Sequence, residues 1–232
     1  MKTLSIIIPS YNEKDTIEEI IRRVKAVSLS GLEKEIIVVD DGSKDGTRGI
    51  LKNLSGVRVV FHDHNQGKGG AVKTGFMAAT GDIILIQDAD LEYDPEDYKK
   101  LLTPILSGNA DVVYGSRFAG GDPHRVLYVF HYAGNRFLTL LSNLLTGLNL
   151  SDMETCYKAF RREVVDSFKN KIKARRFGIE PELTARVARG GWRVYEVGIA
   201  YYGRTYEEGK KINWKDGLAA IWHIVYYNFF TE

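Results

Sequence analysis

Two hydrophobic segments of the sequence each end in paired aspartates, and these acidic pairs are the residues best suited to chemistry. Residues 35–39 are followed by Asp40 and Asp41, and a second such segment is followed by Asp88 and Asp90. Short runs of β-branched residues are typical of buried parallel strands, whose carboxyl ends bind the ligands of open α/β sheets. Two acidic groups at that edge would repel an anionic ligand unless a cation lay between them. The Asp-x-Asp spacing therefore predicts a divalent metal ion that holds a diphosphate, because hard cations take oxygen ligands from carboxylates and phosphates together.

Turn formation is the ordinary alternative for these aspartates, since aspartate is common after strands. On that interpretation Asp88 and Asp90 would shape a turn and bind nothing. The second pair, Asp40 and Asp41, stands at the matching place after another strand. This repetition favours a binding site.

A glycine-rich segment, residues 65–70, contains Lys68 and opens a predicted helix. Its backbone N–H groups and Lys68 could face phosphates or close over a site, and the alternative is a simple glycine-rich helix start. Val72 stands where a dinucleotide-binding loop has its third glycine, and it occupies the place of the glycine that a phosphate loop needs before Lys73 and Thr74. The sequence therefore matches neither of these common nucleotide motifs.

Histidine and cysteine residues offer no better site. His62 and His64 follow a short strand with no second ligand cluster at metal spacing, so we expect solvent-exposed loop histidines. Cys156 has no identifiable histidine partner, so we expect a small buried residue and not a nucleophile.

The elements that must position these residues alternate between strand and helix in the first half of the chain. The hydrophobic pattern predicts strands at 4–8, 35–39, 57–61, 82–87 and 111–114, and helices at 13–27, 46–54, 68–79 and 95–106. Such alternation indicates an α/β fold with a mostly parallel sheet flanked by helices.

The second half has a different pattern. Apolar residues recur at helical spacing over 126–148, which predicts one long helix or two, and 193–202 is expected to form a strand or hairpin. Residues 214–229 predict a final amphipathic helix. The stripe at 126–148 has two interpretations: core packing, or a surface that seats a lipid tail at a membrane, with Arg125 and Arg136 near head groups. No convincing linker divides the chain, so we expect one domain over 1–232.

Composition sets limits on function. The chain has 232 residues, of which 44% are hydrophobic and 27% charged, and its net charge is +2. These values indicate a globular protein and exclude a strongly basic nucleic-acid binder. A single cysteine rules out an intrachain disulfide and favours a reducing compartment. The sequence shows no signal peptide and no apolar stretch of about 18–20 residues, so we expect a soluble or peripheral protein.

Six short motifs, taken together, resemble family 2 glycosyltransferases of the GT-A fold, and within them the dolichol-phosphate mannosyltransferase group. They are residues 8–13 (IPSYNE), 40–47 (DDGSKDGT), 65–69 (NQGKG), 88–91 (DADL), 115–118 (GSRF) and 152–158 (DMETCYK). The resemblance runs from residue 1 to about residue 230, and it implies a GT-A nucleotide-diphospho-sugar transferase fold with C-terminal amphipathic helices.

The resemblance also implies roles for particular residues on the donor side. Pro9, Tyr11 and Glu13 would meet the base and ribose of a nucleotide-sugar, and a metal ion, Mg²⁺ or Mn²⁺, would be held by Asp88 and Asp90 with Glu92 as a third ligand. The full nucleotide-sugar site would comprise Pro9, Tyr11, Glu13, Asp40, Asp41, Lys68, Asp88, Ala89 and Asp90.

On the acceptor side the resemblance implies a cluster of cations that grips a phosphate. The acceptor-phosphate residues would be Arg117, Arg125, Arg204 and Lys210. Asp152 would lie near the transferred sugar, and the catalytic residues would be Asp90, Asp152 and Arg117.

The expected reaction transfers a sugar, with inversion, from GDP-mannose or a UDP-sugar to a polyprenyl or dolichyl phosphate. A phosphate acceptor is already anionic near neutral pH and needs little general-base help. If a sugar hydroxyl of a growing glycan were the acceptor, a base would be essential, and Asp152 or Glu180 would be the candidates. Two further alternatives are a catalytically silent GT-A scaffold and a nucleotidyltransferase, although residues 9–12 lack the glycine- and arginine-rich loop usual in the latter.

The resemblance implies that different parts of the chain bind the donor and the acceptor, and it implies a location in the cell. Residues 1–118 would bind the nucleotide-sugar, and residues 119–232 would bind the acceptor through interfacial helices. We therefore expect a cytoplasmic protein in peripheral contact with the cytoplasmic face of a membrane, with no nucleic-acid partner.

Overall fold

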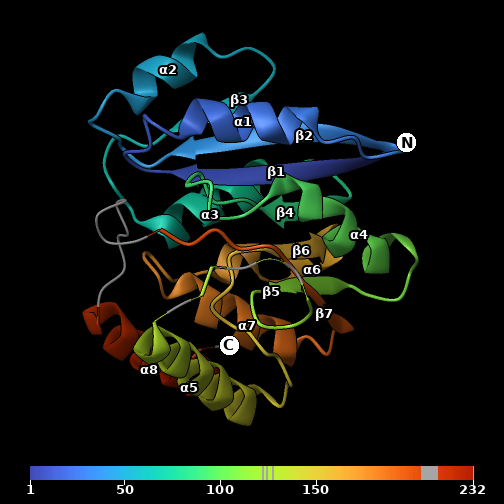
Figure 1. Cartoon of the computed structure of the whole chain (residues 1–232), viewed down its shortest axis with the longest axis vertical. Helices are drawn as coiled ribbons and strands as arrows, with labels where there is room; N and C mark the ends of the chain where they lie inside the picture. The colour runs from blue at the N-terminus through green and yellow to red at the C-terminus, as the bar shows by residue number, and fades with distance from the viewer. Residues whose placement is uncertain (122, 124, 127, 205–213, 232) are drawn as a thin grey trace.

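The protein is built on one seven-stranded sheet, seen in a computed structural model that describes residues 1–121, 123, 125–126, 128–204 and 214–231 (Figure 1). The strand order is β3-β2-β1-β4-β6-β5-β7. β6 runs antiparallel to both of its neighbours, and the other strand pairs are parallel. The strands are β1 (Lys2–Ser10), β2 (Leu32–Asp40), β3 (Arg58–Phe61), β4 (Ile83–Ile86), β5 (Val112–Ser116), β6 (Lys158–Arg161) and β7 (Val194–Gly198). The expected mostly parallel mixed sheet is confirmed.

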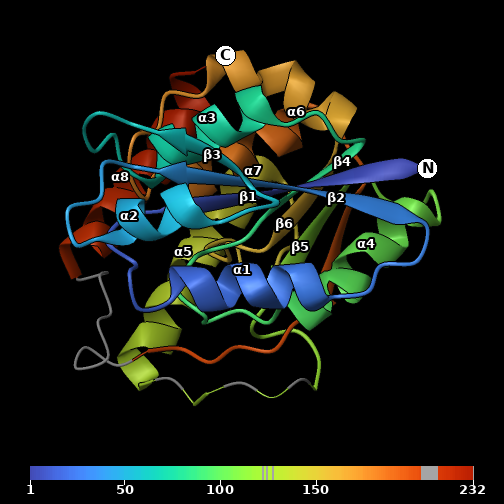
Figure 2. The ribbon, with the colours of Figure 1, turned by 90° about the horizontal axis from the view of Figure 1, so that it is seen from above.

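Helices cover both faces of the sheet. Figure 2 shows α1 and α4 on one face and α3 and α6 on the other. The α-helices are α1 (Ile17–Ala26), α2 (Thr47–Asn53), α3 (Lys68–Ala78), α4 (Tyr98–Leu106), α5 (Val129–Thr146), α6 (Arg162–Phe168), α7 (Ile179–Arg189) and α8 (Trp214–Phe229), with short 3₁₀ turns at Pro95–Asp97 and Lys169–Lys171. α5 and α8 pack against α7, and the C-terminal helices of the expected fold are therefore present.

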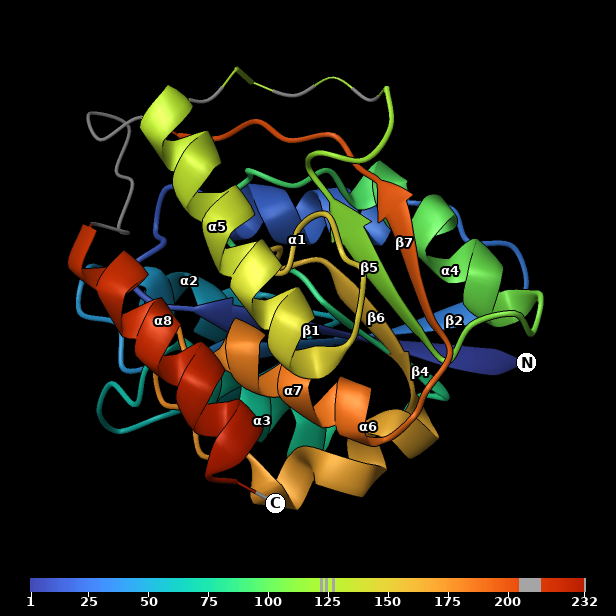
Figure 3. The same ribbon diagram turned by 90° about the horizontal axis from the view of Figure 1, so that it is seen from below.

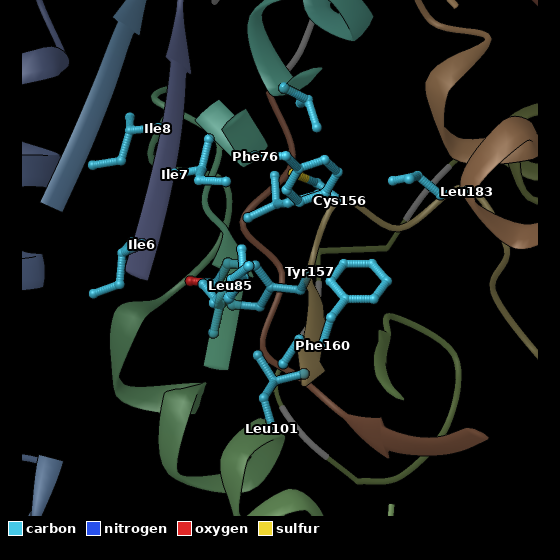
Figure 4. Close-up of a cluster of buried hydrophobic side chains, with 14 of the residues drawn as sticks. Ile6, Ile7, Ile8, Phe76, Leu85, Leu101, Cys156, Tyr157, Phe160 and Leu183 are labelled. Carbon is cyan, nitrogen blue, oxygen red and sulfur yellow. The ribbon is translucent and has the colours of Figure 1, made fainter. Parts of the chain in front are cut away.

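The core lies between the sheet and these helices. Ile6, Ile7 and Ile8 of β1 are fully buried because this central strand is covered on both faces. Figure 4 shows side chains of β1, α3, β4 and β6 meeting in one cluster. The rings of Phe76 and Phe160 pack edge to face, with 6.0 Å between their centroids. Each fully buried aliphatic or aromatic side chain stabilises the fold by roughly 1.5–3 kcal/mol, so the sheet is a rigid base for the loops at its ends.

The loops that follow β1, β2 and β4 emerge at one edge of the sheet. The chain runs outward from β1 through β2 to β3 and then returns to the other side of β1 as β4, so the strand order reverses between β1 and β4. A crevice forms where the connections diverge at such a switch point. Ser10 pairs with Asp40 at the carboxyl end of this region, and Asp88 follows β4 at the same edge.

The segment 158–189 holds elements that the hydrophobic pattern did not predict. β6 has only four residues, and it pairs antiparallel with strands far from it in the sequence. The stripe at 126–148 forms one helix, α5, and the helix predicted at 214–229 is confirmed as α8. Within the described residues, none of the helices combines the length and apolarity needed to cross a bilayer.

Candidate active site

A cavity of about 1230 Å³ opens at the switch-point edge of the sheet. Most of the residues expected to form the site line it together, which supports one shared crevice for the acidic pairs and the cations. Those lining residues are Pro9, Tyr11, Glu13, Asp41, Lys68, Asp88, Ala89, Asp90, Glu92, Arg117 and Arg204. They come from the ends of β1, β2 and β4, the start of α3, the end of β5 and the segment after β7.

Three expected site residues do not line this cavity. Asp40 is fully buried behind it, where its carboxylate accepts from the Ser43 N–H at 3.3 Å and lies 3.6 Å from Arg48. Asp152 is also fully buried, and Arg125 lies beside a separate, smaller hollow. A fourth expected residue, Lys210, falls outside the described residues.

Asp41 organises the glycine-rich loop that precedes α3. Its two carboxylate oxygens accept hydrogen bonds from the N–H groups of Gln66, at 2.8 Å, and Gly67, at 2.7 Å. Gly67 has φ +84°, and a β-carbon there would lie 2.1 Å from the carbonyl oxygen of Arg175. Only glycine therefore allows this loop to approach the 174–175 backbone so closely. The loop places Lys68 at the cavity wall.

His62 supports Asp41 from behind, so the expectation of a solvent-exposed histidine was wrong at this position. Its side chain is buried, with Nδ1 2.7 Å from the Asp41 carboxylate and Nε2 2.9 Å from the Thr74 hydroxyl. A buried imidazole needs partners at both nitrogens, and Asp41 and Thr74 supply them. His64 is exposed, as expected.

Lys68 links the two sides of the cavity. Its Nζ lies 2.9 Å from the Asp88 carboxylate, which follows β4, and 2.9 Å from the Glu180 carboxylate, in the first turn of α7. Burial acts against the charged amine, but Asp88 and Glu180 outweigh it and hold the pKa of Lys68 well above its usual value. Lys68 therefore stays charged and fixes the position of Asp88.

Asp90 and Glu92 share an arginine. The guanidinium of Arg204 donates to the Asp90 carboxylate at 3.1 Å and to Glu92 at 3.4 Å, and Glu92 also accepts from the Tyr201 hydroxyl at 2.9 Å. Burial, with repulsion from Asp88 and Glu92, raises the pKa of Asp90 to about 7. A cation between the aspartates would relieve this repulsion, so Asp88 and Asp90 fit a divalent metal ion.

The Glu92 carboxylate accepts from the Tyr201 hydroxyl and the Arg204 backbone N–H in this arrangement, and its role as a third metal ligand stays a prediction. Among the residues that the structure describes, no set of three or more His, Cys, Asp or Glu side chains is arranged to hold an ion on its own. A metal ion at Asp88 and Asp90 would need phosphate oxygens to complete its coordination, which is the usual arrangement for Mg²⁺.

Arg117 is held by Asp152 beneath the cavity floor. Both oxygens of Asp152 accept from the guanidinium of Arg117 at 2.7 Å, and Oδ2 also accepts from its backbone N–H. Burial opposes the charge of Arg117, but Asp152 holds the pKa of this guanidinium well above its usual value. Arg125 instead donates to the Gly203 carbonyl at 2.7 Å, because its backbone pairs with Tyr201 and so points its side chain along the 201–204 segment.

Several lining residues had no assigned role in the sequence. Tyr93, Glu154 and Cys156 line the polar part of the cavity, and Cys156 is buried as expected. α5 and α8 line the other part with the small or apolar residues Phe130, Gly134, Leu138, Gly217 and Ala220 and with the polar residues His131, Asn135 and Asp216. The apolar stripe at 126–148 was the one sequence signal for this second wall. The cavity therefore joins a strongly charged part to a part of mixed, more apolar character.

Comparison with known proteins gives one family match and several similar proteins. A model of the family described as glycosyl transferase family 2 matches residues 5–168. The UDP-N-acetylglucosamine–dolichyl-phosphate N-acetylglucosaminyltransferase of Methanococcus voltae is 26% identical, over 97% of this chain and 95% of its own length. The undecaprenyl-phosphate 4-deoxy-4-formamido-L-arabinose transferase of Klebsiella pneumoniae is 30% identical, over 90% of this chain and 63% of its own length.

A solved structure shares the fold. Glucosyl-3-phosphoglycerate synthase from Mycobacterium tuberculosis, in complex with Mn²⁺, UDP and glucosyl-3-phosphoglycerate, superposes with a TM-score of 0.72. The two sequences are 24% identical, and the match covers 97% of this chain and 78% of that one.

Proposed function

Because the chain belongs to glycosyl transferase family 2 and is therefore a glycosyltransferase, we propose that it moves a sugar, with inversion and with a divalent metal ion, from a nucleoside-diphospho-sugar to a polyprenyl or dolichyl phosphate. Its α/β fold is the GT-A fold of the proteins it resembles. The observation that carries the proposal is that one cavity is lined both by the charged residues around Asp88 and by apolar side chains of α5 and α8, among them Phe130, Leu138 and Ala220. A charged donor and an acceptor with a lipid tail would fit these two parts of the lining.

The charged part of the cavity suits the donor. Pro9, Tyr11 and Glu13 would meet the nucleoside, and Asp41 would keep the glycine-rich loop and Lys68 in place beside the diphosphate. Asp88 and Asp90 would hold Mg²⁺ or Mn²⁺, which would neutralise charge that develops on the leaving diphosphate. Either GDP-mannose or a UDP-sugar satisfies these contacts, and the Methanococcus relative, whose name gives UDP-N-acetylglucosamine as donor, favours a UDP-sugar.

The acceptor end suits a phosphate. Arg117 and Arg204 would bind a phosphate group between the donor and α5, and Asp152 would act by orienting Arg117. The two candidate bases for a hydroxyl acceptor are both engaged, Asp152 with Arg117 and Glu180 with Lys68. A phosphate acceptor needs no base, so this arrangement favours a polyprenyl phosphate over a sugar hydroxyl.

The outer surface of α5 suits a membrane. Figure 3 shows α5 and α8 lying side by side at the margin of the fold. Leu140 is 58% exposed and Leu144 73% exposed, whereas Thr139 and Ser142 of the same helix are buried. A helix with its apolar side chains turned outward suits an interfacial position. We propose that the protein lies peripherally on the cytoplasmic face of a membrane, with residues 1–118 as the donor half and 119–232 as the acceptor half.

A thermal-shift screen and a product assay test this function. GDP-mannose, UDP-glucose and UDP-N-acetylglucosamine are each added with and without Mn²⁺, and one of them should raise the melting temperature only when Mn²⁺ is present. Addition of undecaprenyl phosphate should then release the nucleoside diphosphate, and Asp90→Ala should abolish the release. Binding without turnover on any acceptor would indicate the silent scaffold, and release of pyrophosphate would indicate a nucleotidyltransferase.

A further inference from the structure

Glu154 is a cavity residue with one unpaired carboxyl oxygen. It lines the cavity, and its Oε1 is buried without a hydrogen-bond partner among the described residues. A buried polar atom without a partner destabilises a folded protein. Such an atom in a ligand cavity points to a partner supplied by the ligand.

The backbone on both sides of Glu154 is fixed by side chains from distant parts of the fold. The N–H group of Asp152 donates to the Glu196 carboxylate at 3.2 Å. The N–H group of Met153 donates to the Thr139 hydroxyl at 3.2 Å, and that of Cys156 donates to the Tyr93 hydroxyl at 3.3 Å. The buried amine of Lys158 binds the carbonyls of Met153 and Thr155. The turn is therefore held rigid while the side chain of Glu154 keeps its hydrogen-bonding capacity for another molecule.

The surroundings of Glu154 favour its neutral form. Burial, and then the negative charge of Glu180, raises the pKa of Glu154 to about 8, although the cations Lys158 and Arg117 act in the opposite direction. A neutral carboxyl group both donates and accepts a hydrogen bond. A hydroxyl group also does both, whereas a metal ion or a phosphate oxygen needs only one of these capacities. The chemistry of the site therefore matches a sugar hydroxyl.

The charged neighbours of Glu154 favour a hydroxyl of the donor sugar. Glu154 lines the same cavity as Asp88, and two charges act on it: that of Glu180, which shares Lys68 with Asp88, and that of Arg117, the proposed acceptor-phosphate residue. The sugar of a nucleotide-sugar projects from the diphosphate toward the acceptor. We propose that Glu154 recognises one hydroxyl of the transferred sugar and so determines which sugar the enzyme accepts, an inference that rests on the proposed function.

Two substitutions of Glu154 test this role. Glu154→Leu keeps the approximate volume and removes both hydrogen bonds, and Glu154→Gln keeps a donor and an acceptor. We expect kcat/KM for the preferred nucleotide-sugar to fall about tenfold or more in Glu154→Leu and to stay within about threefold in Glu154→Gln. The Kd of the nucleoside diphosphate, which lacks the sugar, should be unchanged in both. If Glu154→Leu weakened binding of the nucleoside diphosphate as much as binding of the nucleotide-sugar, the role of Glu154 would be structural. That result would overturn the proposal.

Deoxy donors identify the hydroxyl. Nucleotide-sugars that lack the C2, C3, C4 or C6 hydroxyl are compared in turn, and the wild type should discriminate about tenfold or more against one of them. Glu154→Leu should lose the discrimination against that deoxy donor and leave the response to the other deoxy donors unchanged. The two changes, in the enzyme and in the sugar, then form a double-mutant cycle. Unchanged discrimination against every deoxy donor would overturn the proposal. A wild type that neither binds nor turns over any nucleotide-sugar would instead overturn the proposed function itself.

Discussion

The guanidinium Nη2 of Arg204 lies 3.1 Å from the Oδ2 of Asp90, so a cation of the protein already pairs with a proposed metal ligand. The same guanidinium contacts Glu92 at 3.4 Å and lies 3.9 Å from Glu13. A metal ion at Asp90 would compete with this arginine for the carboxylate. Arg204 would then be released toward the phosphates, which links metal binding to the assembly of the acceptor site.

Replacement of Arg204 by glutamine should therefore have opposite effects on metal binding and on transfer. We expect Arg204→Gln to bind Mn²⁺ about fivefold more tightly without nucleotide, because an ion pair of this partly exposed kind is worth about 1 kcal/mol. Transfer to a polyprenyl phosphate should fall. Calorimetric titration with Mn²⁺ measures the first effect, and nucleoside diphosphate release measures the second.

The matched control for this experiment is Arg48→Gln, which removes an arginine that lies 3.6 Å from Asp40, behind the cavity. Its Mn²⁺ affinity should equal that of the wild type. Weaker Mn²⁺ binding in Arg204→Gln would show that the arginine organises the carboxylates and does not compete with the ion.

The contrast between two neighbouring histidines gives a second prediction. His62 links Asp41 to Thr74, whereas His64 is exposed. We expect His62→Ala to lower the free energy of unfolding by about 1–3 kcal/mol and to weaken nucleotide-sugar binding, because the support of Asp41 and its loop is lost. His64→Ala should change stability by less than about 0.5 kcal/mol. Denaturant unfolding and thermal shifts with ligand test both, and equal behaviour of the two variants would contradict the role of His62.

The donor end of the site follows from sequence pattern because its residues stand directly after strands. Parallel strands with continuous apolar runs place Asp41 and Asp88 at the same edge of the sheet whatever the details of packing. The glycine-rich start of α3 is equally local, since Gly67 and Lys68 are adjacent to the helix they begin. The local sequence pattern is therefore sufficient to predict these features.

The acceptor end depends on contacts that no local pattern reveals. β6 carries a buried lysine, Lys158, whose amine binds the carbonyls of the preceding turn. The sequence of β6 therefore lacks the apolar run that predicts a buried strand. Glu180 meets Lys68, and Arg204 meets Asp90, only after the chain has folded across more than a hundred residues. The burial of His62 is of the same kind, because its partner Asp41 lies in another loop.

A third prediction concerns the exposed apolar face of α5. Leu144 is 73% exposed on α5, and Met77 is 53% exposed on α3, away from the proposed membrane surface. Leu144→Glu should weaken binding to vesicles of anionic lipid about tenfold or more, because it replaces an apolar contact with the lipid by a charge. Met77→Glu adds the same charge and should have little effect. Sedimentation with vesicles measures both, and equal loss in the two variants would point to general electrostatic repulsion.

The final prediction uses the titration of Glu154. Its pKa rises from about 4.5 to about 8 on folding, so the folded protein holds a proton that the unfolded chain releases above pH 4.5. The contribution of the neutral carboxyl to stability is therefore complete below pH 4.5 and is lost as pH rises through about 8. The slope is at most about 1.4 kcal/mol per pH unit.

Glu154→Gln cannot release this proton, so it should gain stability relative to the wild type between pH 5 and 8, by about 1 kcal/mol per unit. The groups around the side chain, Glu180, Lys158, Arg117 and Asp152, are common to both proteins, and so is Asp90. The difference between the two unfolding free energies therefore reports chiefly on Glu154. Urea unfolding at pH 5, 6, 7 and 8 measures that difference. Two parallel curves would mean that Glu154 is ionised throughout, in which case the carboxylate and not the neutral acid would face the cavity.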